Sequence, residues 1–381
     1  MNATTTLDIL ILGGGCAGLS LARELVEQGY LGRVVILEQR TAYTNDRSWS
    51  FWSSNNEDDS ALAAASWSRW RYSMADGRSS VHSVEDIQYH YVPSDRFYRN
   101  ASALIDRCPK VDLRLGTTIN SIERSGQSLQ VRCDDQVFNA DFVIDTRPPK
   151  RQRLGKSTLF QCFSGQILRL APGTIKDPAT VELMTLMRSD DRGFIFDYLL
   201  PMSDQRVLVE ATRFSNRIQD HEAMKGDLQR LIQRRGFEAL AIEHSEYAVL
   251  PMGLPDPDPA SSQPDGVVLA GTAAGALRPA TGYAYLRIQR WARRCAAEMI
   301  RGNAPCPHPK DSRLQRWMDD LFLRVMRQNP DRIPDLFMRL AEQAGPASLV
   351  RFLSDRASLT DRIRVIKSLP VKLFLGHLLK T

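Results

Sequence analysis

The feature that most constrains the fold is a glycine-rich turn within the first twenty residues. An apolar run at residues 9–12 has the length of a buried strand, and the glycines after it are spaced as Gly13-x-Gly15-x-x-Gly18 before a helical pattern begins at Leu19. In a strand–turn–helix unit such glycines permit a tight turn, backbone approach to a pyrophosphate, and close helix packing. The helix N-terminus points its amides and positive dipole end at the phosphates. The residues expected to contact a dinucleotide here are Gly13, Gly15, Ala17 and Gly18.

An acidic residue follows the next predicted strand. Residues 33–37 form that strand, and it ends on Glu38, twenty residues after Gly18. A carboxylate at this place can accept hydrogen bonds from both ribose hydroxyls of an adenine dinucleotide. A 2′-phosphate would require a basic residue instead, so FAD or NAD is favoured over NADP. The alternative is a glycine-rich turn between strand and helix that binds no ligand.

Composition indicates an ordinary globular protein with room for two or more domains. Of 381 residues, 43% are hydrophobic and 25% are charged. No apolar run approaches the roughly 18 residues needed to span a bilayer, and the early strand leaves no room for a signal peptide. The six cysteines have no close pair, which indicates reduced thiols in a cytoplasmic protein rather than disulfides or a metal site.

The net charge of +6 suggests an acidic partner or merely a solvated surface. No helix-turn-helix, zinc or RNA-reading signature accompanies the charge, so nucleic acid is not an expected partner. Residues 303–381 are predicted to be helical and amphipathic, with arginines interleaved among apolar positions. Such a region can dock on an anionic membrane surface, which would make the protein peripherally membrane-associated. The alternative is helix packing with solvated arginines.

The chain after Glu38 is predicted to continue the first sheet. Residues 95–105 have a helical pattern, and residues 118–122, 129–132 and 136–138 alternate like an antiparallel meander. A second buried strand at residues 141–145 ends on Asp145. Because the carboxyl ends of strands line the ligand crevice in a doubly wound sheet, Asp145 and Arg147 are expected to point towards the dinucleotide.

A mixed β/α region is then predicted. Strands are expected at residues 160–170 and 180–187, and the β-rich stretches 193–200 and 206–214 form a hairpin. Its last elements are a helix at residues 220–235 and a strand at residues 247–252.

The chain is then predicted to return to the first sheet with a strand at residues 266–270. It runs into a second small-residue loop, Gly271-Thr-Ala-Ala-Gly275, and then into a helix at residues 283–301. Small residues in the loop let the backbone approach a phosphate at a helix N-terminus. The helix has an apolar face, and its arginines, Arg287 among them, are expected to be solvated.

The chain resembles bacterial lycopene β-cyclases over nearly its whole length. The most specific matching stretches are NDRSWSFW at residues 45–52 and ASLTDRIRVI at residues 357–366. The others are residues 143–149, 198–203 and 208–212, and the loop 271–275 leading into residues 281–283. Flavin hydroxylases of similar layout usually have Gly-Asp where this chain has Gly271-Thr272, which favours the cyclase branch.

The resemblance implies an α/β fold of the flavin hydroxylase type, in which a Rossmann-like FAD-binding domain carries an inserted antiparallel β-sheet domain for the substrate. The FAD-binding domain is expected at residues 1–150 and 265–302, the substrate domain at 151–264 and a helical region at 303–381. Beyond the opening loop, the residues expected to bind the cofactor are Glu38, Arg47, Asp145, Gly271, Thr272, Gly275, Thr281, Gly282 and Tyr283.

The resemblance also implies a reaction without net redox change. Lycopene cyclases bind FAD, need it reduced by NADPH, and close the end of a linear polyene into a β-ionone ring, so the enzyme would be an isomerase of the intramolecular lyase type. Protonation of a weakly basic alkene requires a carboxylic acid that burial keeps protonated. Its conjugate base or an anionic reduced flavin then stabilises the cation.

Glu210 is the predicted catalytic acid and base. It lies in an otherwise apolar strand and aligns with the acidic position of the family's Leu-Glu-x-Thr motif. The alternative is an edge-strand glutamate that faces solvent or pairs with Arg206 or Arg213.

Four further residues are predicted to contact the substrate. Trp49 and Phe51 would flank flavin or polyene, with core packing as the alternative. At two positions the chain departs from the family. The family often has Met-Asp-Phe where this chain has Met184-Thr185-Leu186, and Gly-Trp where this chain has Gly165-Gln166. Loss of a carboxylate and a ring could change the isoprenoid substrate, and Asp190, Asp191 or Asp197 could supply the missing acid.

Two other functions remain open on the sequence alone. A redox flavoenzyme on the same fold, a monooxygenase or prenyl reductase acting on an apolar isoprenoid, would consume NADPH and change the substrate's hydrogen or oxygen count. A polyene or lipid carrier that retains FAD structurally would bind its ligand without turnover and would leave Glu210 without a role.

Overall fold

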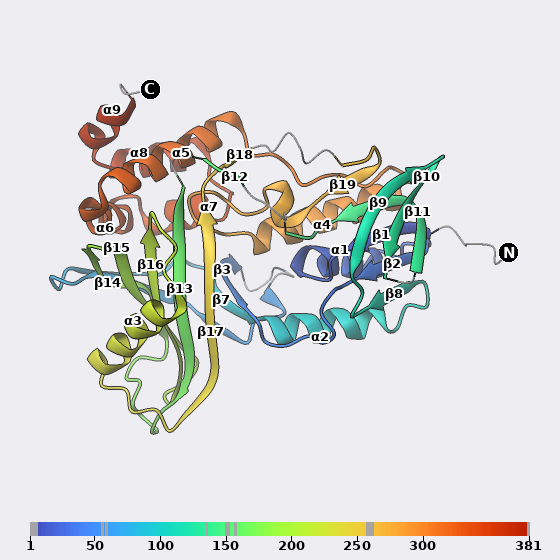
Figure 1. Ribbon diagram of the computed structural model, residues 1–381. Coiled ribbons are helices and arrows are strands. Elements are labelled where there is room, and N and C mark those ends of the chain that lie inside the picture. Colours follow the sequence, from blue (N-terminus) through green and yellow to red (C-terminus); the bar gives the residue numbers. More distant parts are fainter. Residues whose placement is uncertain are drawn as a thin grey trace.

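The structure is a computed structural model that describes residues 7–54, 57, 60–134, 136–148, 153–155, 158–256 and 263–378. Two large β-sheets lie at opposite ends of the molecule, with a layer of helices beside the first and a group of C-terminal helices over the second (Figure 1). A helix long and apolar enough to cross a bilayer does not occur among these residues.

The first sheet is centred on β1 (Leu7–Leu12), which lies parallel to β2 (Val34–Leu37) and to β11 (Gln136–Asp145). β1 and β2 are buried on both faces, which is why both appear in the sequence as unbroken apolar runs. The strand order is β8 (Val111–Arg114), β2, β1, β11, β10 (Ser128–Cys133), β9 (Ile119–Ser125), with β19 (Val267–Leu269) also paired to β11. The predicted parallel strands, antiparallel meander and returning strand are confirmed.

β11 differs from the prediction, which had separate strands at residues 136–138 and 141–145. It is one strand, whose first half pairs antiparallel with β10 and whose second half pairs parallel with β19. Ala140 is fully buried between Leu7 and Leu129, so the polar residues beside it do not interrupt the strand.

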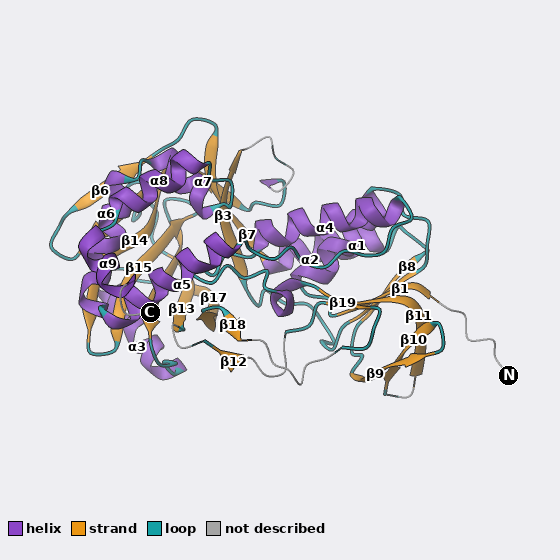
Figure 2. Ribbon diagram, turned by 90° about the horizontal axis from the view of Figure 1, so that it is seen from above, coloured by secondary structure: helices purple, strands orange, loops and turns teal. Residues whose placement is uncertain are grey.

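Helices α1 (Cys16–Glu27), α2 (Ser94–Ile105) and α4 (Tyr285–Ile300) form the layer beside the first sheet, and α1 contacts the other two (Figure 2). α1 begins at Cys16 rather than at Leu19, because Gly15 is its extended N-cap residue and Gly18 lies in its first turn. A side chain at Gly18 would place Cβ 2.0 Å from the Gly13 carbonyl oxygen. Only glycine therefore lets the helix start this close to the strand end.

The second sheet has the order β17 (Ala241–Met252), β13 (Leu159–Arg169), β16 (Arg206–Ser215), β15 (Gly193–Pro201), β14 (Thr180–Asp190), β5 (Arg69–Met74), β6 (Ser79–His82). The predicted hairpin is confirmed as β15 and β16. β17 begins six residues before the predicted strand at Tyr247. The short strands β12 (Arg153–Leu154) and β18 (Pro255–Asp256) pair beside the sheet.

The second sheet also recruits strands from the first third of the chain. β5 and β6 extend it, whereas the predicted division placed residues 1–150 in the first domain. β14 offers a free edge to β5, and this pairing buries Trp70 and Tyr72 in the second core. A three-stranded sheet of β3 (Ser48–Ser54), β7 (Ile87–Pro93) and β4 (Ala65–Trp67) lies between the two large sheets.

Helices cover both faces of the second sheet. α3 (His221–Arg234) packs on the outer face against β13 and β16. The C-terminal helices are α5 (Arg313–Gln328), α6 (Ile333–Gln343), α7 (Pro346–Leu353), α8 (Leu359–Ser368) and α9 (Val371–Leu378). α6 lies across β14, β5 and β6, and Phe337 on it stacks on Phe194 of β15 at 5.4 Å between ring centroids.

Buried ion pairs connect α4 and the loop before it to the C-terminal helices. Arg287, which was predicted to be solvated, is 9% exposed and pairs with Asp311 and Asp355. Arg278 is 1% exposed, pairs with Asp319 and Asp355, and donates to the Phe352 carbonyl at 2.6 Å. The apolar pattern of the helix could not reveal that acidic residues from distant segments fold over Arg287.

Candidate active site

A cavity of about 2380 Å³ lies between the two sheets and runs from the glycine loop to the inner face of β16 and β17. Pockets for drug-sized ligands measure roughly 300–1,000 Å³, so this one has room for a dinucleotide and a second long ligand. Its walls come from the first sheet's carboxyl edge, from β3 and β7, and from apolar residues of α6 and α7 such as Leu340 and Leu349.

At one end of the cavity, Glu38 lies at the carboxyl end of β2 beside the glycine loop. It accepts a hydrogen bond from the Gly14 amide at 2.7 Å and pairs with Arg40 at 3.0 Å. Burial opposes its ionisation, but the hydrogen bonds and charge of Arg40 and the Gly14 amide keep the pKa of Glu38 below its ordinary value. Glu38 is thus a fixed carboxylate at the place predicted for the ribose.

Asp145 lies at the adjacent strand end, because β11 runs parallel to β1 with Asp145 beside Leu12. It is buried and pairs with Arg147 at 2.8 Å, and both side chains line the cavity. Both residues therefore lie where the sequence predicted them, at the edge of the crevice.

The second small-residue loop meets the first. Gly271 opens a 3-10 helix, η2 (Gly271–Ala274), and a side chain there would place Cβ 3.0 Å from Cβ of Ala17. Thr272 on this loop is exposed, and Thr281, Gly282 and Tyr283 follow along the cavity wall. Gly275, in contrast, closes η2 and is absent from the residues that line the cavity. Two loops of glycine and other small residues, together with a carboxylate at the strand end, form a cradle that fits an adenine dinucleotide.

Aromatic residues line the middle of the cavity. Phe51 is buried and stacks on Tyr285 of α4 at 5.0 Å, and Trp49 packs against Tyr285 and Phe97 at 5.3 Å. Both rings also line the cavity. Each ring therefore packs in the core with one part and forms part of the cavity wall with another. Arg47 is exposed at the cavity rim and pairs with Asp46 at 2.8 Å.

Two tyrosines extend this wall towards the second sheet. The hydroxyl groups of Tyr89 on β7 and Tyr198 on β15 are 2.8 Å apart. Burial holds the pKa of Tyr198 well above its ordinary value. These phenols therefore stay neutral at physiological pH.

At the far end, Glu210 faces the cavity from a central strand. β16 lies between β13 and β15, so Glu210 is not on a sheet edge. The residues on either side of it, Val209 and Ala211, point to the α3 side. Its predicted alternative partners are engaged elsewhere: Arg206 pairs with Glu243 at 2.7 Å and Arg213 with Asp227 at 3.0 Å.

A second carboxyl group lies beside Glu210. Glu246 of β17 and Glu210 of β16 are both cross-strand partners of Gly165 on β13, and both line the cavity. A side chain at Gly165 would place Cβ 3.2 Å from Glu246 Oε1 and 3.4 Å from Glu210 Cγ. The glycine thus leaves the space over which the two carboxyl groups converge.

The environment of this pair favours protonation. Burial raises the pKa of Glu210 well above its ordinary value, and the charge of Glu246 adds to the rise, against the hydrogen bond that the Thr212 hydroxyl donates. Burial also raises the pKa of Glu246. No ion pair found among the described residues includes either carboxyl group. The site can therefore hold an undissociated acid at neutral pH.

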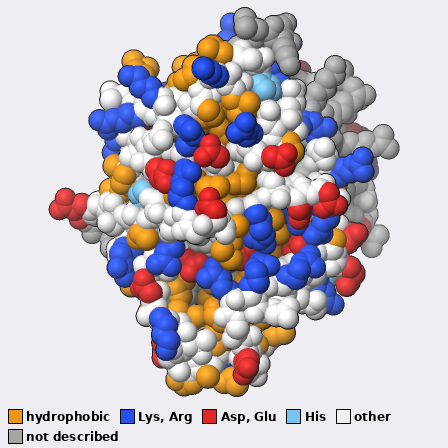
Figure 3. All heavy atoms as spheres, turned by 90° about the vertical axis from the view of Figure 1, so that its left-hand side faces the viewer, with side chains coloured by type: hydrophobic (Ala, Val, Ile, Leu, Met, Phe, Trp, Pro, Cys, Tyr) orange, Lys and Arg blue, Asp and Glu red, His pale blue; other side chains and the backbone are white. Residues whose placement is uncertain are grey.

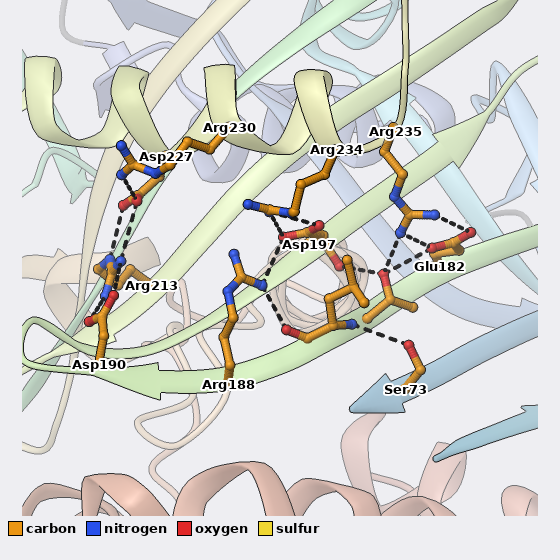
Figure 4. A network of polar contacts seen from close by, with 12 residues as sticks. Ser73, Glu182, Arg188, Asp190, Asp197, Arg213, Asp227, Arg230, Arg234 and Arg235 are labelled. Carbon is orange, nitrogen blue, oxygen red and sulfur yellow. Dashed lines mark hydrogen bonds and ion pairs between the residues drawn. The ribbon is translucent and has the colours of Figure 1, made fainter. Parts of the chain in front are cut away.

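Thr185 and Gln166, predicted to contact the substrate, are absent from the residues that line the cavity. Thr185 lies at an irregular pairing of β14, is 1% exposed, and donates to Glu182 at 2.9 Å. Thr185 also accepts a hydrogen bond from Arg235 at 3.2 Å, and Arg235 and Glu182 belong to a polar network between the sheet and the end of α3 (Figure 4). Gln166 follows Gly165 and so points to the opposite face, where it bonds to Ser245 at 3.3 Å.

The aspartates considered as replacement acids are engaged in the same network or exposed. Asp197 is fully buried and pairs with Arg234 at 3.0 Å and Arg188 at 3.3 Å, and Asp190 pairs with Arg213 (Figure 4). Asp191 is exposed in a turn. None of the three lines the cavity.

Glu246 and Arg40 are the main site residues that sequence reasoning missed. The predicted strand began at Tyr247, one residue after Glu246, so the carboxyl group fell outside it. Extending the alternation of side chains along the strand towards the N-terminus would have included Glu246 in the strand. Its position opposite Gly165 depends on the pairing of β17 with β13, which only the tertiary structure shows. Arg40 had no signal of its own in the sequence.

The comparison with known families decides the relationship. A profile described as Lycopene cyclase protein matches residues 8–376. The chain belongs to the lycopene cyclase family.

The similar curated proteins include other members of this family. The lycopene beta-cyclase of Pantoea ananas is 24% identical over 384 residues, which cover 95% of this chain and 94% of that protein. The lycopene beta-cyclase of Pseudescherichia vulneris is 25% identical over 385 residues, with 95% and 94% covered.

Solved structures with the same fold are flavoenzymes of several kinds. A geranylgeranyl bacteriochlorophyll reductase-like protein from Thermoplasma acidophilum has a TM-score of 0.58 at 15% identity, covering 98% of this chain and 95% of its own. The p-nitrophenol 4-monooxygenase of Pseudomonas putida has a TM-score of 0.58 at 12% identity, and the match covers 99% of this chain and 97% of the monooxygenase. This lycopene cyclase family member thus has the predicted Rossmann-like fold of the flavin hydroxylase type.

Proposed function

We propose that the chain is an FAD-dependent lycopene β-cyclase, an isomerase that closes a β-ionone-type ring at the end of an apolar polyene. The observation that carries the proposal is Glu210, a carboxyl group with a raised pKa on the wall of a long aromatic and apolar cavity that begins at the dinucleotide cradle. The names of the similar curated proteins support the same reaction class.

FAD is assigned to the cradle because the residues there fit it. The open space beside Gly15 leaves room for backbone approach to a pyrophosphate, Gly13 and Gly271 line the same cavity, and Glu38 is a fixed acceptor for ribose hydroxyls. When bound in reduced form, with NADPH as the electron donor that we propose, FAD supplies negative charge next to a developing cation.

Glu210 performs the proton transfer in this proposal. Its undissociated carboxyl group donates a proton to a terminal alkene carbon, a neighbouring double bond attacks the resulting tertiary cation, and a ring proton is lost to a base. The faces of Tyr89, Tyr198 and Phe51 can stabilise the cation. Substrate and product have the same mass.

The test is pigment analysis in a lycopene-accumulating bacterium that expresses the chain. Wild type is expected to yield monocyclic or bicyclic product of unchanged mass, and Glu210→Gln to lose about a hundredfold or more in turnover while retaining FAD. Glu238→Gln is the matched control, since Glu238 is exposed in the segment before β17. Near-wild-type cyclisation by Glu210→Gln would refute the assignment, and product with a changed mass would favour a monooxygenase or reductase.

We also propose an anionic membrane surface as the partner from which the substrate is taken. Consecutive helices α8 and α9 expose an apolar row, Leu359, Ile363, Ile366, Val371 and Leu375. Basic side chains of the same helices, among them Arg364, Lys367 and Lys372, are exposed beside it. Figure 3 shows one face of the molecule on which apolar side chains lie among lysine and arginine side chains and several acidic ones. Such a surface suits the headgroup region of an anionic leaflet.

A further inference from the structure

We propose that Glu246 is a second catalytic residue, and that Glu210 and Glu246 act as a carboxyl pair that holds one proton and one negative charge. The inference rests on the proposed cyclase function. Three observations carry the proposal. Both side chains line one cavity, and both residues are cross-strand partners of Gly165, from the strands on either side of β13. Because Gly165 has no side chain, the space between the two carboxyl groups is open.

Among the residues that the structure describes, no unpaired cation lies beside the two carboxyl groups that would let both ionise. Glu210 faces the hydroxyls of Thr212 on its own strand and of Tyr198 on β15. Tyr91 of β7 lies near Glu246, and the charged groups beyond it are Arg206, which is paired with Glu243, and Asp95. His244 lies two residues before Glu246 on β17, and burial lowers its pKa, so it stays neutral. Like charges in a shared site with no cation retain one proton between them.

This charge state supplies both an acid and a base. Glu210 gives its proton to the terminal alkene carbon, and the new carbon–carbon bond forms at the cation. The Glu246 carboxylate removes the ring proton, which creates the ring double bond. Transfer of that proton from Glu246 to Glu210 restores the starting state, so no proton is consumed and no carbon is oxidised or reduced.

The first test compares pH profiles of the purified FAD-loaded protein supplied with lycopene in vesicles. Glu246→Gln is expected to lower kcat about a hundredfold without raising KM, and to move the alkaline loss of the remaining activity to lower pH. The shift follows because the neutral amide no longer raises the proton affinity of Glu210. Glu246→Asp is expected to recover part of the rate, and Glu238→Gln, at an exposed position before β17, to change neither rate nor profile.

The second test needs no substrate and separates this proposal from the proposed function. Infrared titration of carboxyl C=O bands is expected to show one carboxyl group that stays protonated above neutral pH in wild type and titrates at lower pH in Glu246→Gln. An unchanged titration together with an unchanged pH profile would overturn the pair. If wild type makes no cyclic product while the titration shifts as expected, the pair stands and the cyclase reaction is wrong.

Discussion

At the residue scale, the site depends on one glycine and two glutamates in adjacent strands. Gly165, Glu210 and Glu246 occupy one register position of β13, β16 and β17. Such a cluster in an apolar wall is unfavourable for stability at high pH, because a buried carboxyl group ionises at a greater free-energy cost than the same group in water. Its cost is expected to appear in the pH dependence of folding.

The sign follows from the raised pKa of Glu210. Glu210 binds its proton more tightly in the folded protein than in the unfolded chain. The stabilisation from this proton is therefore complete at pH values below the ordinary pKa and is lost as pH rises through the raised pKa of the folded state. Glu210→Gln should therefore leave the free energy of unfolding nearly unchanged at about pH 4 and raise it by about 1 kcal/mol or more at about pH 9. Urea unfolding at the two pH values measures this. An equal effect at both would contradict a raised pKa.

At the element scale, the start of α1 is set by two glycines with different roles. Gly18 lies where a Cβ would meet the Gly13 carbonyl oxygen at 2.0 Å, whereas a Cβ at Gly15 would meet no protein atom within 4 Å. Gly15 has an ordinary φ of −83°, so alanine is sterically allowed there. The space beside Gly15 is thus free for a ligand, and the space beside Gly18 is filled by the strand end.

The two alanine substitutions should separate folding from cofactor binding. Gly18→Ala is expected to lower the stability of the apoprotein by about 2 kcal/mol or more, because the helix must move away from β1. Gly15→Ala should leave the apoprotein's melting temperature nearly unchanged but weaken FAD binding at least tenfold, because its methyl group occupies the pyrophosphate's place. Thermal unfolding and flavin fluorescence titration measure the two effects. Equal FAD affinity of Gly15→Ala and wild type would place the cofactor elsewhere.

At the scale of the whole molecule, the C-terminal helices close one wall of the cavity and present an outer apolar row. Leu340 and Leu349 line the cavity, while Ile363 and Leu375 point outwards at 44% and 49% exposure. The buried pairs of Arg278 and Arg287 hold these helices to the first domain. A docking surface on α8 and α9 would therefore move with the cavity rather than independently of it.

The docking surface should be separable from the fold. The double variant Ile363→Ser/Leu375→Ser is expected to keep the wild-type melting temperature and to lose most flotation with phosphatidylglycerol vesicles, because exposed apolar area drives insertion. Leu240→Ser, at a 66% exposed position on the second sheet's side, is the control. Wild-type flotation should weaken with added salt. Absence of wild-type flotation at low salt would remove the membrane proposal.

The sequence by itself determined the local chemistry of this protein. The apolar runs, the glycine spacing and Glu38 specified a nucleotide-type sheet and its loop, because each follows from short-range geometry between neighbours in the chain. The β15–β16 hairpin was recognised for the same reason, whereas the role of the acid in its second strand was inferred from the family resemblance. Long-range pairing was decided only by the tertiary structure. It carried β5 and β6 into the second sheet, buried Arg287 under Asp311 and Asp355, and turned Thr185 and Gln166 away from the cavity. It also brought Glu246 to Glu210 across Gly165, since strand register between distant segments depends on side-chain packing over the whole sheet.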